Sequence, residues 1–271
     1  MKLSIITVNL NNAVGLQKTI DSVLAQTWQE FEHIIIDGGS TDGSKEIISQ
    51  YTETKVLLTY NLKWISEPDS GIYEAMNKGI KKASGEYIHF LNSGDFLVDK
   101  FVYEKVFTIE LKEDVIYGNK IEMYPDGSEI LNKGLAKSNV FFEDVFKGLI
   151  PHSCSFSKRE LFHKYDFFDE TFKIAADTGF FLNTIGIHQS SVRYIDIVIS
   201  KFDMTGISKK LEFKELRDQE IIGIRKKIMS PTLVNAYEFY LKYEFIIRCI
   251  KKRKITWFVF RLLYKFSRKI N

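Results

Sequence analysis

Three acidic residues lie in turns beside apolar, strand-like runs of the chain. Asp37 follows the run Phe31 to Ile36, Asp69 precedes a helical stretch, and Asp95 follows the run Tyr87 to Leu91. A carboxylate after a buried strand can accept the N–H of a nucleobase, or hold a divalent cation when a substrate supplies diphosphate oxygens. The pattern therefore indicates a nucleotide site, with Asp95 as the ligand of a Mg2+ or Mn2+ ion. Asp37, Asp69 and Asp95 each have an alternative structural role, as a turn residue or as the N-cap of a helix.

Two other nucleotide-binding patterns are excluded. The separation of Gly38 and Gly43 imitates a phosphate-binding P-loop, but Ser44-Lys45 reverses the required order and turns the lysine by about 100° around the helix. No G-x-G-x-x-G follows a strand-like run. Neither a P-loop NTPase nor a dinucleotide-binding Rossmann domain therefore fits.

Strand-like and helix-like runs alternate through the first 120 residues, which predicts a mostly parallel sheet with helices on both faces. Expected strands are Leu3 to Val8, Phe31 to Ile36, Val56 to Tyr60, Trp64 to Ser66, Tyr87 to Leu91 and Val115 to Gly118, and expected helices are Ala13 to Gln26, Ser44 to Tyr51 and Ile72 to Ala83. Ligands of such sheets lie beyond the carboxyl ends of the strands. We therefore expect the acidic turns to meet at one edge.

The pattern changes after Gly118, which marks a second region. Its expected elements are a hairpin turning at Pro125-Asp126-Gly127, helices near 140–147 and 177–185, an extended stretch 152–157 and a strand over 192–202. From Lys210 the chain is expected to be helical, with a break at Ser230-Pro231. The predicted organisation is a domain over 1–208, in halves 1–118 and 119–208, and a helical extension over 209–271.

Four motifs carry a resemblance to a known family. Ser4 to Asn9, Asp37 to Ser44, Ala75 to Gly79 and Ser84 to Asp95 occur in order, and together they resemble the family 2 glycosyltransferases, most strongly over the first 100 residues. The resemblance implies an α/β GT-A fold, a nucleotide-sugar donor and a divalent metal, Mn2+ or Mg2+. It also implies, for most members, inversion at the anomeric carbon.

The resemblance assigns roles to residues by their position in the motifs. Thr7, Asn9 and Asp37 would hold the nucleoside, Asp69 would lie near the base or ribose, and Asp95 would bind the metal, with Ser93 at the position of the first acid of the usual Asp-x-Asp. That substitution leaves one ligand neutral or absent, which weakens the expected affinity for metal. It occurs in a subgroup with Asn-Ser-Gly-Asp, which resembles enzymes of bacterial capsule, O-antigen or exopolysaccharide synthesis.

The resemblance continues into 150–152, 168–177 and 206–208. An inverting displacement needs a base within reach of the acceptor hydroxyl, and Asp177 occupies the position of that base, with a helix N-cap as its alternative role. His152 is expected either to line the acceptor pocket or to be a buried histidine. Lys209 is expected either in a lid that meets the diphosphate or as a solvated lysine.

Charge is distributed unevenly over the 271 residues. The net charge of +3 separates into about −6 for the body and +9 for residues 242–269, where ten Lys or Arg alternate with aromatic and aliphatic residues. An acidic body argues against nucleic-acid binding, whereas such a tail suits an anionic membrane surface or a dimer interface. The two cysteines, Cys154 and Cys249, form no disulfide framework or zinc motif. No signal peptide or run of about 20 apolar residues is found.

These observations predict a cytoplasmic enzyme, with possible attachment to the inner face of the cell membrane. It is expected to be an inverting hexosyl- or N-acetylhexosaminyltransferase that moves a sugar from a UDP-sugar to a hydroxyl of a saccharide or lipid-linked saccharide in surface polysaccharide synthesis. Two alternatives stay open: a catalytically silent relative that acts as a membrane-associated assembly partner, and a nucleotidyltransferase on the same kind of sheet. The second is disfavoured because Asn9 to Asn12 is not a basic, glycine-rich loop.

Overall fold

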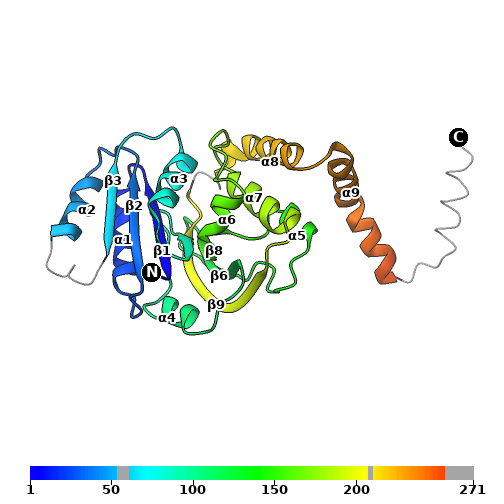
Figure 1. Cartoon of the computed structure of the whole chain (residues 1–271). Coiled ribbons are helices and arrows are strands. Elements are labelled where there is room, and N and C mark those ends of the chain that lie inside the picture. The colour runs from blue at the N-terminus through cyan, green and yellow to red at the C-terminus, as the bar shows by residue number, and fades with distance from the viewer. Residues whose placement is uncertain (54–60, 207–209, 254–271) are drawn as a thin grey trace, which may run out of the picture. The chain divides into compact units, whose positions relative to one another are not determined.

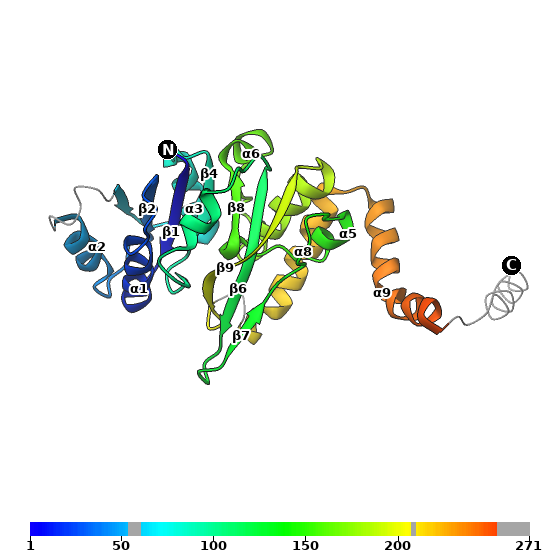
Figure 2. The same ribbon diagram turned by 90° about the horizontal axis from the view of Figure 1, so that it is seen from below.

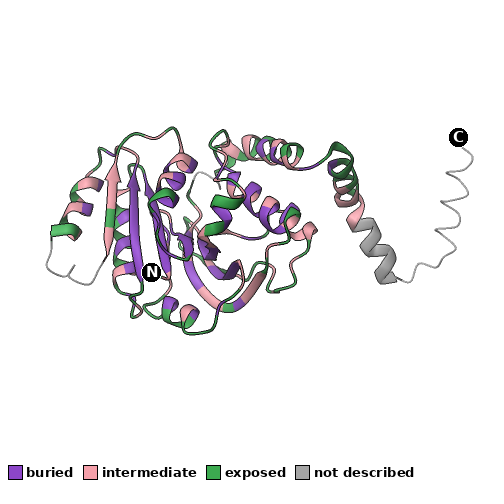
Figure 3. Ribbon diagram, viewed as in Figure 1, coloured by how far each residue is buried: buried purple, intermediate pink, exposed green. Residues whose placement is uncertain are grey.

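The structure is a computed structural model that describes residues 1–53, 61–206 and 210–253. The expected strand 56–60, Lys209 and the end of the basic tail lie outside the described residues. The described part of the chain forms one nine-stranded sheet, with helices packed against it (Figure 1). Its strands are buried where they cross the middle of the sheet (Figure 3).

The N-terminal half of the sheet is parallel, as predicted. Its strands lie in the order β3 (Leu62–Ser66), β2 (Phe31–Asp37), β1 (Leu3–Asn9) and β4 (Tyr87–Phe90). All seven residues of β1 and of β2 are buried, as expected for strands covered on both faces, although each strand contains three polar residues. The register pairs the last residues of β1, β2 and β3 with one another, so the polar turns that follow them open at the same edge.

Helices cover both faces of this half, because alternate side chains of a strand point in opposite directions. One face packs against α1 (Ala13–Leu24), α2 (Ser44–Glu53) and α4 (Val102–Phe107) through two apolar clusters. The other face packs against α3 (Ile72–Lys82), where Gly79 lies so close to Ile6 that a Cβ would be 2.5 Å from a methyl carbon.

The C-terminal half of the sheet is mixed (Figure 2). Its strands are β5 (Phe96–Leu97), β6 (Val115–Met123), β7 (Glu129–Asn132), β8 (Ser155–Lys158) and β9 (Val192–Asp203). Strand β8 lies antiparallel between β4 and β6, and β9 runs parallel to β6 and then antiparallel to β5. The hairpin predicted at residues 125–127 is confirmed, because β6 and β7 pair antiparallel on either side of it.

Short helices and turns carry the side chains of the second half. They are α5 (Phe142–Phe146), a 3-10 turn over His152–Cys154, α6 (Arg159–Lys164), α7 (Ala176–Phe181) and a π-helical stretch over Leu182–Ile187. None of these is long enough to be stable by itself, since isolated helices need about 12–15 residues. Packing therefore holds them: Phe162 of α6 stacks on Phe180 of α7, with ring centroids 4.1 Å apart.

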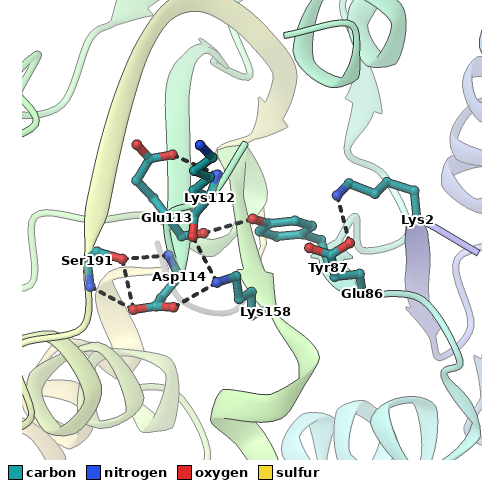
Figure 4. Close-up of polar contacts among 8 residues, drawn as sticks. All are labelled: Lys2, Glu86, Tyr87, Lys112, Glu113, Asp114, Lys158 and Ser191. Atoms are coloured by element: carbon teal, nitrogen blue, oxygen red, sulfur yellow. Dashed lines mark hydrogen bonds and ion pairs between the residues drawn. The ribbon is translucent and has the colours of Figure 1, made fainter. Parts of the chain in front are cut away.

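The edge opposite the polar turns is occupied by paired charges (Figure 4). Lys158 contacts Asp114 at 3.1 Å, Asp114 also accepts a hydrogen bond from Ser191, and Lys2 contacts Glu86 at 2.7 Å. An open pocket of about 330 Å3 lies beside Glu86 and Lys158. Because Lys158, Asp114, Lys2 and Glu86 pair with one another in this way, they help to hold the strand ends together at this edge.

Two longer helices follow, α8 (Lys214–Ile228) and α9 (Pro231–Arg253), with the predicted break between them. The chain divides into two compact units, Met1–Ile224 and Arg225–Asn271, so the division falls within α8. Among the residues that the structure describes, no helix is both long and apolar enough to cross a bilayer.

Candidate active site

The end of β2 carries a carboxylate surrounded by donors. Asp37 is fully buried, and its Oδ1 accepts from the Asn9 side-chain amide at 2.8 Å. Its Oδ2 accepts from the Ser66 hydroxyl at 2.6 Å and from the Ser40 backbone N–H at 3.0 Å. Burial alone would raise the pKa of Asp37, but these hydrogen bonds lower it below its ordinary value. Asp37 is therefore an ionised acceptor that is already held in place.

Asp69 lies beside this group. Its Oδ2 would be only 2.8 Å from a Cβ at Gly38, so a side chain at Gly38 would displace the carboxylate. Burial and the neighbouring acids Glu74 and Asp37 raise the pKa of Asp69, although Lys78 opposes them. The structure thus brings together Asn9, Asp37 and Asp69, three of the residues predicted to contact the nucleoside.

Thr7 lies apart from them, inside the sheet. It is fully buried, its hydroxyl donates to the Leu91 carbonyl at 2.7 Å, and it pairs with the His33 ring at 2.8 Å. Burial lowers the pKa of His33 to about 3, so this ring stays neutral. These contacts give Thr7 a structural role that holds β1 against its neighbours.

The turn after β4 presents Asp95 toward the end of β9. Asp95 is 5% exposed, and its Oδ1 accepts the Asp203 backbone N–H at 2.9 Å. The hydroxyl of Ser93 donates to the Asn12 carbonyl, so it faces the start of α1. The carboxylate of Asp203 lies alongside the same turn, since its Oδ2 would be 3.5 Å from a Cβ at Gly94.

The predicted metal fits this arrangement. Burial is the main cause that raises the pKa of Asp95 to about 7, and the nearby Asp203 carboxylate acts in the same direction, although the Asp203 N–H and the Lys120 charge oppose it. Asp95 and Asp203 are two carboxylates at one turn, so they would hold a hard divalent cation, which would supply positive charge there. No cluster of three or more His, Cys, Asp or Glu is arranged as ligands among the described residues. The substrate's diphosphate oxygens would therefore have to complete the coordination.

A buried lysine also lies in this region. The ammonium of Lys120 on β6 is 3.1 Å from Glu122 and 4.0 Å from the centre of the Phe202 ring, and its charge acts favourably on Asp95. Lysine is almost never buried without a partner. Lys120 and Asp203 are two residues that sequence reasoning missed; the expected strand ended at Gly118, whereas β6 continues to Met123 and includes Lys120.

Asp177, the predicted base, forms a dyad with His152. His152 Nδ1 is 2.8 Å from Asp177 Oδ2, and the two side chains are 20% and 18% exposed. Tyr73 of α3 donates to Asp177 Oδ1 at 3.1 Å, and Nε2 of His152 lies 3.4 Å from the amide nitrogen of Asn92. Asn92 belongs to the turn that contains Asp95, so this chain of contacts joins the predicted base to the predicted metal site. Tyr73 and Asn92 were not identified from the sequence.

The approach to α7 is fixed from α8. The carboxylate of Glu220 is buried and accepts the backbone N–H groups of Lys173, Ile174 and Ala175 at 2.7, 2.9 and 3.0 Å. Asp177 follows two residues later. Glu220 therefore orders the segment that positions Asp177. No sequence motif could indicate this contact, because Glu220 lies 45–47 residues beyond the segment along the chain.

The sheet and the polar residues gathered at the carboxyl ends of its parallel strands are those of an α/β protein that binds its ligand at this edge. Residues 4–166, more than half of the chain, match the model of glycosyl transferase family 2, and the chain belongs to that family. The predicted GT-A fold is confirmed by the solved structures that resemble it.

Several relatives resemble the chain over most of its length. An uncharacterized glycosyltransferase of Mycobacterium tuberculosis is 32% identical over 250 residues, which cover 88% of this chain and 92% of the relative. A PGL/p-HBAD biosynthesis glycosyltransferase of Mycobacterium bovis is 28% identical over 218 residues, which cover 78% and 81%.

Among solved structures, S. aureus TarS 1–349 has a TM-score of 0.61 at 22% identity. The match covers 75% of this chain and 60% of TarS, and a similar match is found to TarS in complex with UDP-GlcNAc. A mannosyltransferase of Pyrobaculum calidifontis, in complex with GDP-Man and Mn2+, has a TM-score of 0.56 at 14% identity and covers 74% and 56%. At these identities the likeness concerns the fold alone.

Proposed function

We propose that this chain is an inverting glycosyltransferase that uses a UDP-sugar and a saccharide or lipid-linked saccharide acceptor in surface glycan synthesis. The single observation that carries the proposal is the chain of contacts from Asp95 through Asn92 and His152 to Asp177. These contacts connect the residue that we propose as a cation ligand with the residue that we propose as the base, and they support the proposal because they lie where the parallel strands end. The 1–118 half would bind the donor, and the 119–208 half would bind the acceptor.

The residues would divide the work as follows. Asn9 and Asp37, which hydrogen bonds already order, would bind the nucleoside together with the neighbouring Asp69. Asp95, with Asp203 beside it, would hold a divalent cation, which neutralises charge on a departing diphosphate when it is bound. The proton of the acceptor hydroxyl would leave toward Asp177 and its partner His152.

The relatives support this direction. One of them is named for PGL/p-HBAD biosynthesis, and TarS binds UDP-GlcNAc in its solved complex. UDP rather than GDP is therefore the first nucleotide to test. The transferred sugar, whether a hexose or an N-acetylhexosamine, follows from the same screen.

The test is a calorimetric titration of UDP, GDP and CMP with and without Mn2+, on the wild-type chain and on Asp95→Ala. The expected result is Mn2+-dependent binding of UDP that is lost in Asp95→Ala and kept in a control, Glu110→Ala, at an exposed acid that pairs with Lys112 before the start of β6. Selectivity for GDP or CMP would replace the UDP assignment. Absence of any nucleotide binding would favour the silent assembly partner, and release of pyrophosphate from a nucleoside triphosphate would favour a nucleotidyltransferase.

We also propose that the basic segment 242–269 attaches the protein to an anionic membrane surface. The support is its ten basic residues and their aromatic neighbours, together with the exposed Phe239 on α9. Vesicles that contain phosphatidylglycerol should sediment the protein, whereas phosphatidylcholine vesicles should not. A stable dimer in analytical ultracentrifugation without vesicle binding would assign the segment to a subunit interface instead.

A further inference from the structure

The His152–Asp177 dyad allows the protons at the site to be assigned. Asp177 accepts three hydrogen bonds, from the Tyr73 hydroxyl and the Thr178 backbone N–H at Oδ1 and from the His152 ring at Oδ2. Burial alone would raise the pKa of Asp177, but the hydrogen bonds from His152, Thr178 and Tyr73 lower it below its ordinary value. Asp177 is therefore ionised at neutral pH and is a weak proton acceptor, because each donor stabilises the carboxylate and not the acid.

The tautomer of His152 follows from this. An ionised carboxylate can only accept hydrogen bonds, so the ring nitrogen that faces it at 2.8 Å, Nδ1, must carry a proton. In the neutral ring Nε2 then has a free lone pair. The group that faces Nε2 is the Asn92 amide nitrogen at 3.4 Å, beyond the normal range for a hydrogen bond, so the lone pair is only weakly engaged.

Asn92 offers a second, independent observation. Its Oδ1 is buried and has no hydrogen-bond partner among the described residues. A buried amide oxygen without a donor costs stability. Rotation of the amide by 180° would bring this oxygen toward Nε2, where it would accept a hydrogen bond from a protonated ring. Asn92 is thus placed to stabilise His152 as an imidazolium.

We infer that Nε2 of His152 is the atom that takes the proton of the acceptor hydroxyl, and that Asp177 is a positioning residue that holds the ring in the reactive tautomer. The inference rests on the proposed glycosyl transfer. In that step the acceptor oxygen forms a bond to the anomeric carbon, and the bond from that carbon to the phosphate oxygen breaks. Its electron pair leaves with the nucleoside diphosphate, the hydroxyl proton moves to Nε2, and the imidazolium later releases it to water.

The arrangement explains why both residues keep partial exposure. A fifth of the His152 side chain is exposed, which leaves room for a hydroxyl to approach Nε2. Imidazole also suits this role, because a base whose ordinary proton affinity lies near neutral pH is the most efficient at that pH. The carboxylate behind it keeps the ring oriented and stabilises the charge that forms, as in other carboxylate–histidine pairs.

The first test needs no turnover. Nitrogen-15 NMR of the histidine rings should show His152 as the Nδ1–H tautomer in the wild-type chain and a change of that signal in Asp177→Ala. A His152 ring protonated at Nε2 and bare at Nδ1 would overturn the inference. This measurement stays informative even if the sugar donor is not the one proposed.

The second test uses the donor and acceptor found by the nucleotide screen. His152→Gln and Asp177→Asn should each lower kcat by roughly 100-fold or more with UDP binding unchanged, and the double variant should be no worse than either, because the two act as a unit. Imidazole in solution should partly restore His152→Ala but not Asp177→Ala. The control His163→Gln, at an exposed ring on α6, should keep wild-type kcat.

Two outcomes separate the inference from the function on which it rests. If His152→Gln keeps kcat within about threefold of wild type while Asp177→Asn loses it, Asp177 is the direct base and the inference is wrong, although the glycosyltransferase proposal stands. If the wild-type chain binds no nucleotide and transfers no sugar, the proposed function fails, and the kinetic part of the inference fails with it.

Discussion

Glu220 is the residue outside the polar edge whose loss should be felt most strongly at the site. In Glu220→Ala the N–H groups of Ile174 and Ala175, both in buried residues, lose their acceptor, while that of Lys173 is exposed enough to reach water. A buried donor without a partner costs about 1–3 kcal/mol. Two such donors give an expected loss of about 3 kcal/mol in the free energy of unfolding.

Glu220→Ala should also lower activity, because Asp177 lies two residues after the segment 173–175 that loses its acceptor. A shift of about 1 Å in a reacting group can cost roughly 100-fold in rate, so we expect kcat to fall at least tenfold with little change in the donor KM. Urea unfolding and steady-state kinetics measure the two effects. Glu215→Ala is the matched control, since this exposed glutamate of the same helix contacts only Gln219 in the described structure, and it should change stability by less than about 0.5 kcal/mol.

Either of two results would refute this reasoning. Unchanged stability in Glu220→Ala would mean that water replaces the carboxylate at no cost. A loss of stability with unchanged kcat would mean that the segment before α7 orders the fold but does not position Asp177.

Three further predictions concern a buried charge, two helical glycines and Asp95. Glu32 is fully buried, and its pKa is lowered to about 2 despite burial, because Lys63, Ser4 and Ser84 donate to it. Since the pKa of Glu32 in the unfolded chain is about 4.5, the ionised Glu32 contributes about 3 kcal/mol of stability above pH 4.5, and this contribution is lost as the pH falls toward 2. Wild type and Glu32→Gln should therefore differ by that amount in urea unfolding at pH 7 and converge in acid. Equal stability of the two at pH 7 would contradict the assignment. Alanine at two helical glycines should change the free energy of unfolding in opposite directions. Gly79→Ala should lower it by about 1–3 kcal/mol, because the new Cβ would lie 2.5 Å from Ile6. Gly223→Ala should raise it by about 0.5–1 kcal/mol, because the nearest atom to the new Cβ is 3.6 Å away and alanine favours the helix. Asp95→Asn should lose Mn2+-dependent binding of UDP in calorimetry and yet unfold at no lower a temperature than the metal-free wild type, because it removes a buried carboxylate; a large drop in Tm would indicate a structural role for that charge.

The parallel half of the fold was predictable because its signals are local. Each buried strand contains a short apolar run, and each is followed by a turn rich in Asn, Gly, Asp or Ser. The second half was only partly predictable. The strand at Val192–Asp203 was expected, but its parallel pairing with β6 and antiparallel pairing with β5 join residues about 75–105 positions apart, which periodicity cannot reveal.

The candidate site shows the same division. The positions of Asn9, Asp37, Asp69, Asp95 and Asp177 were singled out from motifs and strand ends. The partners of Asp177 were not, because His152 is 25 residues away and Tyr73 is 104 residues away along the chain. The sequence left two alternative roles for His152, in an acceptor pocket or as a buried histidine. Only the structure shows that its ring contacts Asp177.

The buried parallel strands and the short helices, which lie on the two sides of the site, should also differ in how readily their backbone hydrogen bonds open. Asn9 and Asp37 end strands that are buried along their whole length, so their backbone amides should exchange with solvent only when the entire sheet unfolds. The short helices α5, α6 and α7 depend on packing alone, and their amides should exchange through local opening. Hydrogen exchange should therefore divide the edge into a slowly exchanging side at the parallel strands, where we propose that the nucleotide binds, and a quickly exchanging side at the short helices, where we propose that the acceptor binds. An acceptor would then enter and leave while the nucleotide stays bound.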